Sequence, residues 1–553
     1  MVERLLSELR QQGVRIRSDG DRVVCDAPPN VMTPELIEQL REHKEQIIEF
    51  LNQEPGKAKA DDEFVVPTIS RTMEIPLSFA QESLWFLDQL NSDTASYNIP
   101  IKLRLLGEVD QDVLRRSLNE IVRRHEILRT CFRTLAGRPI QVIAAPPTLS
   151  VPIVDLTEVP TETREEEAAR LCREQAERPF VLDRDLMLRA ILFRLEKDKH
   201  ILFLNLHHIA SDAWSLEILF RELGTLYEAF SKGHPSPLKE LPVQYADFAA
   251  WQRGRLTEKT LAHQLKYWRR QLDGAPPILD LPTEWPRPPV QTFHGSIETA
   301  LVSTSLAAGL KGLSQREGVS LFMTLLAAFQ VLLHRYSGQL DITIGSPILN
   351  RSRTGLESVI GLFVNTLPLR VDLSGNPTFR QLLSRAREVV LGAYENQDIP
   401  FDILVKELQP ERNLSYSPLF QVLFAVQNAP AGSAGPATLN VQSEFVSSAT
   451  SKFDLSLYMR EHAEGLVAEI EYCTDLFGRE MIRQMLDHFA VLLNGIVENP
   501  SEHVNTLPLL TDGDPLGVDG FATHRVSIDD APDAYRAFQE KTDGHIKVQL
   551  KPW

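Results

Sequence analysis

The chain has 553 residues, of which 43% are hydrophobic and 24% are charged, as in an ordinary globular protein. Such a length exceeds what one hydrophobic core usually organises, so two or three folding units are expected. The net charge of −17 argues against nucleic acid as the main partner, and no apolar run is long enough to cross a membrane. Scattered cysteines and an N-terminus without an apolar signal-peptide run favour a cytoplasmic protein with reduced thiols.

Residues 1–53 are predicted to form a small separate unit. VERLLSELRQQG carries leucines on one helical face and ends at Gly13, and VRIRSDGDRVVCD alternates apolar and polar residues around a central Asp-Gly, as hairpins do. A second helix is expected from Thr33, with Pro34 at its first position. A helix–hairpin–helix unit this short buries only a small hydrophobic core. It is therefore an N-terminal extension without a role of its own, a dimer, or a unit completed by a partner.

The rest of the chain is predicted to be a mixed α/β protein. Residues 54–76 are polar and rich in proline, which indicates a linker. Strand-like segments (YNIPIKLRLLG, KHILFLNL, QLDITIGSPI) then alternate with helix-like ones (QDVLRRSLNEIVRRH, EILFRELGTLYEAF, LFMTLLAAFQVLLHRY). This pattern favours two α/β lobes, which we divide into 77–250 and 251–508. A closing segment, 509–553, has a different, loop-like character at its start.

Two adjacent histidines and an aspartate lie in LNLHHIASDAWS, between a strand-like run and a helix-like run. Because side chains alternate along a strand, His207 and His208 are expected to point in opposite directions, which disfavours a shared metal ion. Asp212 falls where the next helix begins, so it is predicted to cap that helix or to anchor the loop through an ion pair. An anchored loop would hold a cavity-facing imidazole in one orientation.

One imidazole without an evident serine, cysteine or second acid beside it suits acyl transfer from an activated donor to an amine or hydroxyl. The substrate supplies the nucleophile, and the protein positions it and manages one proton. The HHxxxD pattern alone is weak, since a structural histidine pair at a strand end explains it equally well.

Further motifs, read together with HHxxxD, resemble those of the condensation domains of nonribosomal peptide synthetases, in the same order and spacing. They are LSFAQESLWFLDQL (77–90), RRHEILRTCF (123–132), YADFAAWQR (245–253), IGLFVNTLPLR (360–370), ENQDIPFDILV (395–405) and NLSYSPLFQVLFAVQN (413–428). The resemblance covers about 77–508 and leans toward the subtype that joins an L-configured donor to an L-configured acceptor. Residues 1–53 are similar to the docking domains that begin some synthetase subunits.

This resemblance implies two chloramphenicol-acetyltransferase-like lobes in a V, with a tunnel between them. Within the motif, His208 would be the catalytic histidine that orients or deprotonates the attacking amine, and His207 would be structural. Asp212 would pair with Arg351 to hold the loop. The family usually has glycine where this chain has Ala213, and a methyl group there would narrow the tunnel, or strain the backbone if φ is positive.

Other motif residues have structural as well as tunnel-lining interpretations. Asn365 is expected to bond the crossover between the lobes or only a turn, and Ser78 and Gln81 to cap the first helix or border the tunnel. Arg124 and His125 are interpreted as structural network residues. The structural or tunnel-lining group comprises Arg351, Ala213, Ser215, Asn365, Ser78 and Gln81.

The chain shows no phosphate loop, no dinucleotide fingerprint, no adenylation motif and no carrier-protein serine motif. No metal and no cofactor of its own are therefore expected, and both substrates would arrive on the phosphopantetheine arms of carrier proteins in other chains. Amide formation is the predicted reaction, with ester formation or a non-catalytic recruiting role as alternatives. Residues 523–553 resemble the C-terminus of zinc-type alcohol dehydrogenases, which suggests a fusion remnant rather than a working dehydrogenase.

Overall fold

The computed structural model falls into two units, Met1–Val66 with Arg353–Gly355 and Pro67–Ser352 with Leu356–Trp553. We describe each unit by itself. The residues that the structure describes are 15–19, 22–26, 66–90, 95–256, 258–351, 353, 355–410, 413–427, 440–445, 450–510, 524–527 and 548–551.

The smaller unit contains an antiparallel hairpin. Its strands are β1 (Arg15–Asp19) and β2 (Arg22–Asp26), with Asp19 opposite Arg22 at the turn. This confirms the hairpin predicted around the central Asp-Gly. The two helices predicted on either side of it lie outside the described residues.

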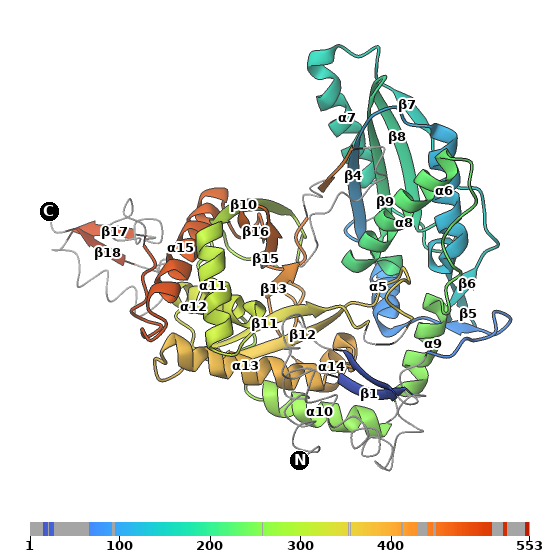
Figure 1. Ribbon diagram of the computed structural model, residues 1–553. Coiled ribbons are helices and arrows are strands. Elements are labelled where there is room, and N and C mark those ends of the chain that lie inside the picture. The colour runs from blue at the N-terminus through green and yellow to red at the C-terminus, as the bar shows by residue number, and fades with distance from the viewer. Residues whose placement is uncertain are drawn as a thin grey trace. The chain divides into compact units, whose positions relative to one another are not determined.

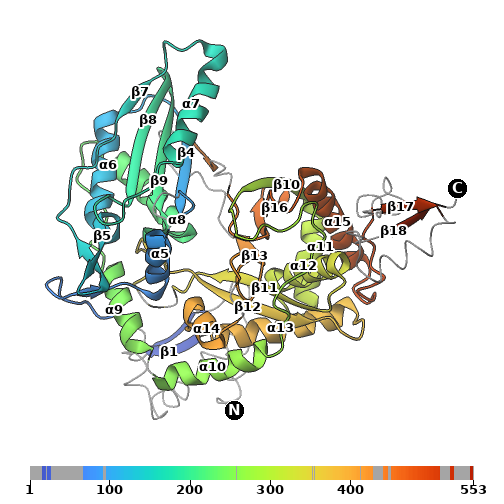
Figure 2. The same cartoon turned by 180° about the vertical axis from the view of Figure 1, so that it is seen from behind.

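The first lobe of the larger unit is built on a five-stranded sheet. Figures 1 and 2 show α6 (Gln111–Arg124) and α8 (Ala213–Ser231) on one face and α7 (Thr161–Ala176) on the other. β9 is buried on both faces, which explains why KHILFLNL is a continuous apolar run rather than an alternating one. The strands, in spatial order, are β14 (Asn440–Phe445), β4 (Asn98–Leu106), β9 (Lys199–His207), β8 (Leu188–Glu196) and β7 (Ile153–Asp155).

One strand of this sheet comes from far along the chain. β14 pairs antiparallel with β4, with Phe445 opposite Ile101. Position in sequence alone had placed residues 440–445 with the second lobe. The edge strand of a sheet has unpaired N–H and C=O groups that can hydrogen-bond to any strand lying beside it. The pairing of β14 with β4 therefore depends on their proximity in the fold rather than on their positions in the sequence.

The second lobe is built on a six-stranded sheet. β13 runs parallel to both of its neighbours, whereas the other pairs are antiparallel. Its strands, in spatial order, are β10 (Gly295–Ser303), β16 (Gly465–Cys473), β15 (Leu455–His462), β13 (Val422–Gln427), β11 (Asp341–Ile348) and β12 (Asn365–Asp372). The helices that share its apolar core include α11 (Thr304–Arg316), α12 (Leu321–Ser337), α13 (Phe379–Glu395) and α15 (Arg479–Glu498).

Shorter elements complete the unit. They are β3 (Ile75–Pro76), β5 (Thr130–Leu135) and β6 (Arg138–Ile143), which form a small sheet, and α5 (Phe79–Leu90), α9 (Tyr245–Arg255), α10 (Glu258–Leu272) and α14 (Phe401–Leu408). The arrangement confirms the predicted mixed α/β fold. It also confirms the strands predicted in YNIPIKLRLLG, KHILFLNL and QLDITIGSPI, which are β4, β9 and β11.

In the closing segment, β17 (His524–Ser527) pairs in parallel with β18 (Val548–Lys551). The resemblance of this segment to alcohol dehydrogenases stays a prediction. Within the described ranges, no single helix is long and apolar enough to cross a membrane; α11 and α12 pass that test together but are bent by 107°.

Candidate functional site

The two histidines lie where β9 ends and a single turn of 3₁₀ helix, His208–Ala210, begins. The predicted strand KHILFLNL ended at Leu206, and β9 extends one residue further, to His207. The His207 ring caps the turn, because its Nδ1 accepts a hydrogen bond of 3.1 Å from the main-chain N–H of Ile209. This cap turns the chain away from the sheet, so the two neighbouring side chains reach different surroundings.

His207 is packed into the first lobe and is only 5% exposed. Its ring meets that of Phe180 edge-on at 5.7 Å between centroids and that of Tyr97 at 6.4 Å. Burial, assisted by the charges of Lys452 and Arg189, lowers the pKa of His207 to about 3. The ring is therefore neutral near pH 7, which agrees with the structural role predicted for it.

His208 is half-buried and begins the 3₁₀ turn. Its main-chain N–H donates to the carbonyl of Tyr97 at 2.8 Å. Nδ1 is buried without a hydrogen-bond partner in the described part of the chain, and main-chain hydrogen bonds at His208 and Ser211 oppose part of the fall in the pKa of the ring. Burial, followed by the charge of Lys452, lowers the pKa of His208 to about 3. Near pH 7 the ring is therefore neutral, so one ring nitrogen carries a lone pair that can accept a hydrogen bond.

The low pKa of His207 predicts a loss of stability in acid. In the unfolded chain this histidine is protonated below a pKa of about 6.5, whereas in the native protein it is protonated only below about pH 3. The free energy of unfolding therefore falls as the pH drops from about 6.5 to about 3. When the pH is lowered from 7.5 to 5.0, the free energy of unfolding should fall in both proteins, but by about 2 kcal/mol less in His207→Asn than in the parent. Urea titration at the two pH values measures this difference. His462→Asn, at an exposed position ending β15, should behave like the parent. Equal losses in all three proteins would contradict this assignment.

Asp212 performs both of the roles predicted for it. It is the N-cap of α8, where Oδ1 accepts from the main-chain N–H of Ser215 at 2.9 Å. The same oxygen lies 2.9 Å from Nη2 of Arg351, and both side chains are at most 5% exposed. Oδ2 accepts from the main-chain N–H of Phe363 at 3.0 Å. The carboxylate therefore ties the start of α8 to residues that lead into the second lobe.

Ser215 and Gly361 extend this buried connection. Ser215 Oγ lies 2.9 Å from Nη2 of Arg351 and 2.9 Å from the carbonyl oxygen of Gly361, whose N–H donates back to it at 3.0 Å. Gly361 also lies directly against the ring of Tyr245, where a Cβ would come within 1.9 Å of a ring carbon. Only glycine permits this approach, which explains the residue in IGLFVNTLPLR.

Ala213 causes no backbone strain. It is the first residue of α8 and is exposed, and its φ is negative, unlike that of the six non-glycine residues in the described part that have positive φ. The first position of a helix accepts any residue with ordinary helical angles. Of the two predicted consequences of this departure from the family motif, strain is therefore wrong, and narrowing of a tunnel stays a prediction.

The other predicted site residues are mainly structural. Ser78 and Gln81 form a reciprocal cap at the start of α5, and Nε2 of Gln81 also reaches the carbonyl of Ile209, beside the histidines, at 3.3 Å. Asn365 begins β12, and its amide donates to the carbonyls of Gln397 and Ile399 at 3.0 and 2.8 Å. It therefore fixes the turn before α14 rather than facing the histidines.

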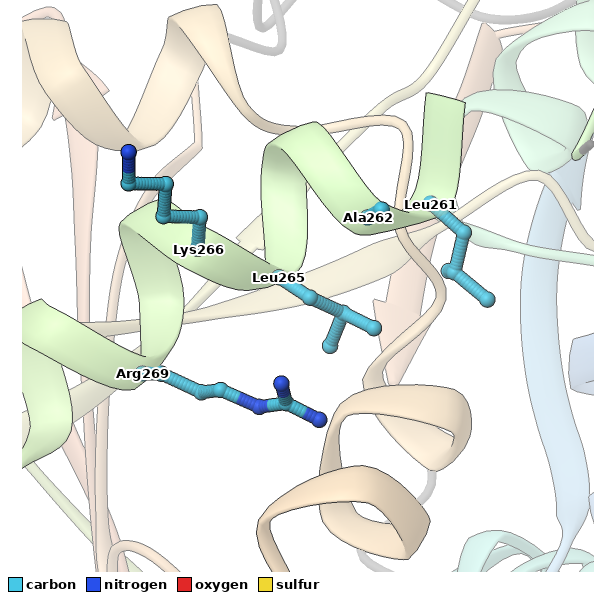
Figure 3. Close-up of a pocket in the computed structure, with 5 residues that line it drawn as sticks. All are labelled: Leu261, Ala262, Leu265, Lys266 and Arg269. Carbon is cyan, nitrogen blue, oxygen red and sulfur yellow. The ribbon is translucent and has the colours of Figure 1, made fainter. Parts of the chain in front are cut away.

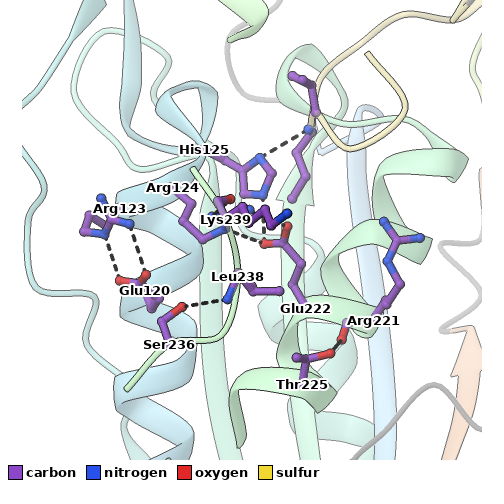
Figure 4. Close-up of polar contacts among 12 residues, drawn as sticks. Glu120, Arg123, Arg124, His125, Arg221, Glu222, Thr225, Ser236, Leu238 and Lys239 are labelled. Atoms are coloured by element: carbon purple, nitrogen blue, oxygen red, sulfur yellow. Dashed lines mark hydrogen bonds and ion pairs between the residues drawn. The ribbon is translucent and has the colours of Figure 1, made fainter. Parts of the chain in front are cut away.

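A second buried network lies beside the site (Figure 4). Glu222 on α8 accepts from Arg124 at 3.1 and 3.2 Å and from Nε2 of His125 at 3.0 Å. Nδ1 of His125 accepts from the main-chain N–H of Ile360 at 3.3 Å, so Nε2 carries the ring proton. Burial lowers the pKa of His125, against the opposing effect of Glu222. Arg124 and His125 are thus structural, as predicted. Together with Glu222 they connect α6 and α8 to the 360–363 segment.

Replacing Glu222 with glutamine should strand the buried guanidinium of Arg124 without a counter-charge. We expect a loss of about 3 kcal/mol in the free energy of unfolding, measured by denaturant titration. Glu228→Gln, on the exposed side of the same helix, should change it by less than about 0.5 kcal/mol. Similar values for the two variants would show that the network contributes no more than a surface ion pair.

Sequence patterns did not reveal Tyr97, Lys452 and Glu222 as neighbours of the site. Tyr97 supplies a carbonyl to His208 and a ring to His207. Lys452 comes from the second lobe, and its ammonium lies 5.0 Å from the centroid of the Tyr97 ring. Tyr97 is the first residue of YNIPIKLRLLG, the segment predicted as a strand, and directly precedes β4. No local pattern marks Lys452, because 244 residues separate it from His208 and only the fold brings the two together.

Two cavities lie away from the histidines. One, of about 380 Å³, is bordered by Leu261, Leu265 and Arg269, spaced one turn apart on α10 (Figure 3). The other, of about 440 Å³, is bordered by the 71–75 segment, β6 and its neighbours. In the part of the chain that the structure describes, no group of three or more His, Cys, Asp and Glu side chains is placed to hold a metal ion. The histidine site therefore remains the candidate for chemistry.

Comparison with protein families matches residues 71–515 to the condensation domain and residues 2–53 to the TubC N-terminal docking domain. One subunit of the linear gramicidin synthase of Brevibacillus parabrevis is 48% identical over 455 residues, which is 80% of this chain but 6% of that protein. This chain thus spans less than a tenth of the length of that relative.

Solved structures agree with this assignment. The X-domain from teicoplanin biosynthesis, alone and in complex with OxyB, matches at 27% identity with TM-scores of 0.74 and 0.73, covering 81% of this chain and 100% and 98% of those chains. The first condensation domain of the calcium-dependent antibiotic synthetase, in complex with a substrate analogue, shares the fold at 22% identity, with a TM-score of 0.67 and coverage of 79% and 100%. The chain therefore belongs to the condensation-domain family of nonribosomal peptide synthetases, a family of amide-bond-forming acyltransferases, and carries a docking domain of the TubC type before it.

Proposed function

We propose that this chain forms a peptide bond between two carrier-bound groups in the cytoplasm. The amine of an aminoacyl acceptor attacks the thioester of an acyl or peptidyl donor, and the L-donor, L-acceptor combination is the one that its motifs favour. The observation that carries the proposal is the neutral His208 on a turn between β9 and α8, which the buried Asp212–Arg351 pair holds in place. In this role His208 orients the amine or takes its proton, while His207 and Asp212 hold the turn.

The partners that we propose are donor and acceptor carrier proteins, together with the C-terminal tail of an upstream synthetase protein that binds residues 1–53. Support for the docking interaction comes from the family match over residues 2–53. The phosphopantetheine arms belong to the carriers, so this chain's own residues need only position two thioesters and move one proton. Neither a nucleic acid nor a membrane is part of the proposal.

The test is condensation in solution. The full chain is mixed with a donor carrier bearing an aminoacyl group and an acceptor carrier bearing a second one, and the dipeptidyl thioester is measured by mass spectrometry. Product from the parent but not from His208→Ala supports the proposal, and equal product from both removes His208 from the mechanism. An acceptor with a hydroxyl in place of the amine tests the ester-forming alternative at the same site.

A second candidate function is a non-catalytic recruiting module. It is favoured by the similarity to the X-domain from teicoplanin biosynthesis, which was solved in complex with OxyB. Under this alternative, the parent binds loaded carriers in a pull-down or by calorimetry but gives no condensation product with any donor–acceptor pair. Product formation by the parent would exclude it.

A further inference from the structure

The segment before β15 is held firmly against the second lobe. The main-chain N–H of Ser451 donates to the carbonyl of Phe293 at 2.9 Å, and Nε2 of Gln291 donates to the carbonyl of Lys452 at 2.8 Å. The main-chain amide of Lys452 also bonds the carboxylate of Glu471 on β16. Contacts on both sides of the residue therefore fix the position from which the lysine side chain projects.

The Lys452 ammonium ends beside the histidines of the first lobe. Nζ lies 5.0 Å from the centroid of the Tyr97 ring, and the carbonyl of Tyr97 accepts from the main-chain N–H of His208. Among the residues that the structure describes, no oxygen forms a hydrogen bond or an ion pair with this Nζ. A half-buried ammonium without an acceptor is unfavourable for the protein alone. The ammonium therefore has no direct acceptor in the described chain, and the carboxylate that acts on it from a distance, that of Glu471, is bonded to the main chain of Lys452.

The charges around this position leave the ammonium available. Glu471 uses its carboxylate on the Lys452 main chain and forms no contact ion pair with Nζ, and burial raises its pKa. Burial lowers the pKa of Lys452 itself, an effect that the charge of Glu471 opposes. Burial also raises the pKa of Tyr97 to about 12, so its phenol stays neutral. The charged groups that act on Lys452 and the two histidines are Arg189, His207 and Glu471, and the charge of Asp402 acts on Tyr97.

We propose that Lys452 stabilises the negative charge that develops on the thioester carbonyl oxygen during condensation. This inference rests on the function proposed above. The new C–N bond forms as the carbonyl electron pair moves to oxygen; the C–S bond then breaks, and the leaving thiolate takes up the proton that the amine has lost to His208. A fixed cation beside the reacting carbonyl favours the charged intermediate over the neutral substrates, and it also keeps the neighbouring imidazole neutral.

The experiment compares Lys452→Met with Lys452→Arg in the full chain, using loaded donor and acceptor carriers. Methionine keeps the length of the side chain and removes its charge. We expect a loss of about a hundredfold in the saturated single-turnover rate, with the KM for each carrier nearly unchanged, and rescue to within about tenfold by arginine. The acid limb of the pH–rate profile of Lys452→Met should move to higher pH, because removing a cation raises the pKa of His208. Lys197→Met, at an exposed lysine far from the histidines, is the matched control.

The possible results separate this inference from the function on which it rests. If the parent forms no product, the proposed function fails first. If the parent turns over and Lys452→Met matches it, or changes KM alone, the ammonium does not act on the developing charge and the inference is overturned. If Lys452→Met melts far below the parent, its rate is measured at a temperature where it keeps the circular dichroism spectrum of the native protein. If the acid limb of its pH–rate profile is then the same as that of the parent, the inference is also overturned.

Discussion

His208→Ala is expected to lower the saturated rate of dipeptide formation by about a thousandfold, as is usual when a residue that accepts a proton in the transition state is removed. Its melting temperature should stay within about 2 °C of the parent, because among the described residues the ring is hydrogen-bonded only to main-chain groups of its own turn, at His208 and Ser211. The main-chain bond from residue 208 to Tyr97 does not depend on the side chain. Single-turnover kinetics and thermal melts of the two proteins check both expectations.

His462→Ala serves as the control for this pair of measurements, since His462 is exposed at the end of β15. It should keep both the rate and the melting temperature. A large drop in the melting temperature of His208→Ala would show instead that the ring is a packing residue. An unchanged rate would exclude it from proton transfer.

Asp212→Ala is expected to lower the free energy of unfolding by about 3–5 kcal/mol, because the buried Arg351 loses its partner while both remain away from water. The substitution also removes the acceptor for the N–H groups of Ser215 and Phe363. The turn that carries His208 should then lose its fixed position, and condensation should fall with stability. Urea titration followed by intrinsic fluorescence measures the first effect, and single-turnover kinetics measure the second.

Asp487→Ala is the matched control, since Asp487 is exposed on α15 and its removal should change stability by less than about 0.5 kcal/mol. Arg351→Met removes the other partner and should be similarly costly, whereas replacing Asp212 and Arg351 together should cost less than the sum of the two single changes. Additive losses would show that the two residues stabilise the protein independently. A melt of Asp212→Ala equal to that of the parent would assign Asp212 to chemistry rather than to structure.

Sequence patterns predicted the secondary structure around the site because that structure depends on neighbours. The apolar run before His207 is buried on both faces of β9, and Asp212 caps α8 by accepting an N–H three residues ahead. The opposite surroundings of His207 and His208 also follow from their adjacency at a strand end. The 3₁₀ turn that follows β9 was not predicted, since it depends on the His207 ring accepting a hydrogen bond from the main-chain N–H of Ile209.

The sequence by itself determined the mixed α/β class, the hairpin near the N-terminus and the motif that carries His208, since each of these depends on periodicity or spacing within a short stretch. The pairing of Asp212 with Arg351 came from the family resemblance, and the fold places the two 2.9 Å apart. Only the tertiary structure brought Lys452 to Tyr97 and placed β14 beside β4. Local propensities carry no information about such contacts, because the free energy that holds them comes from burying surfaces that meet only after both lobes have folded.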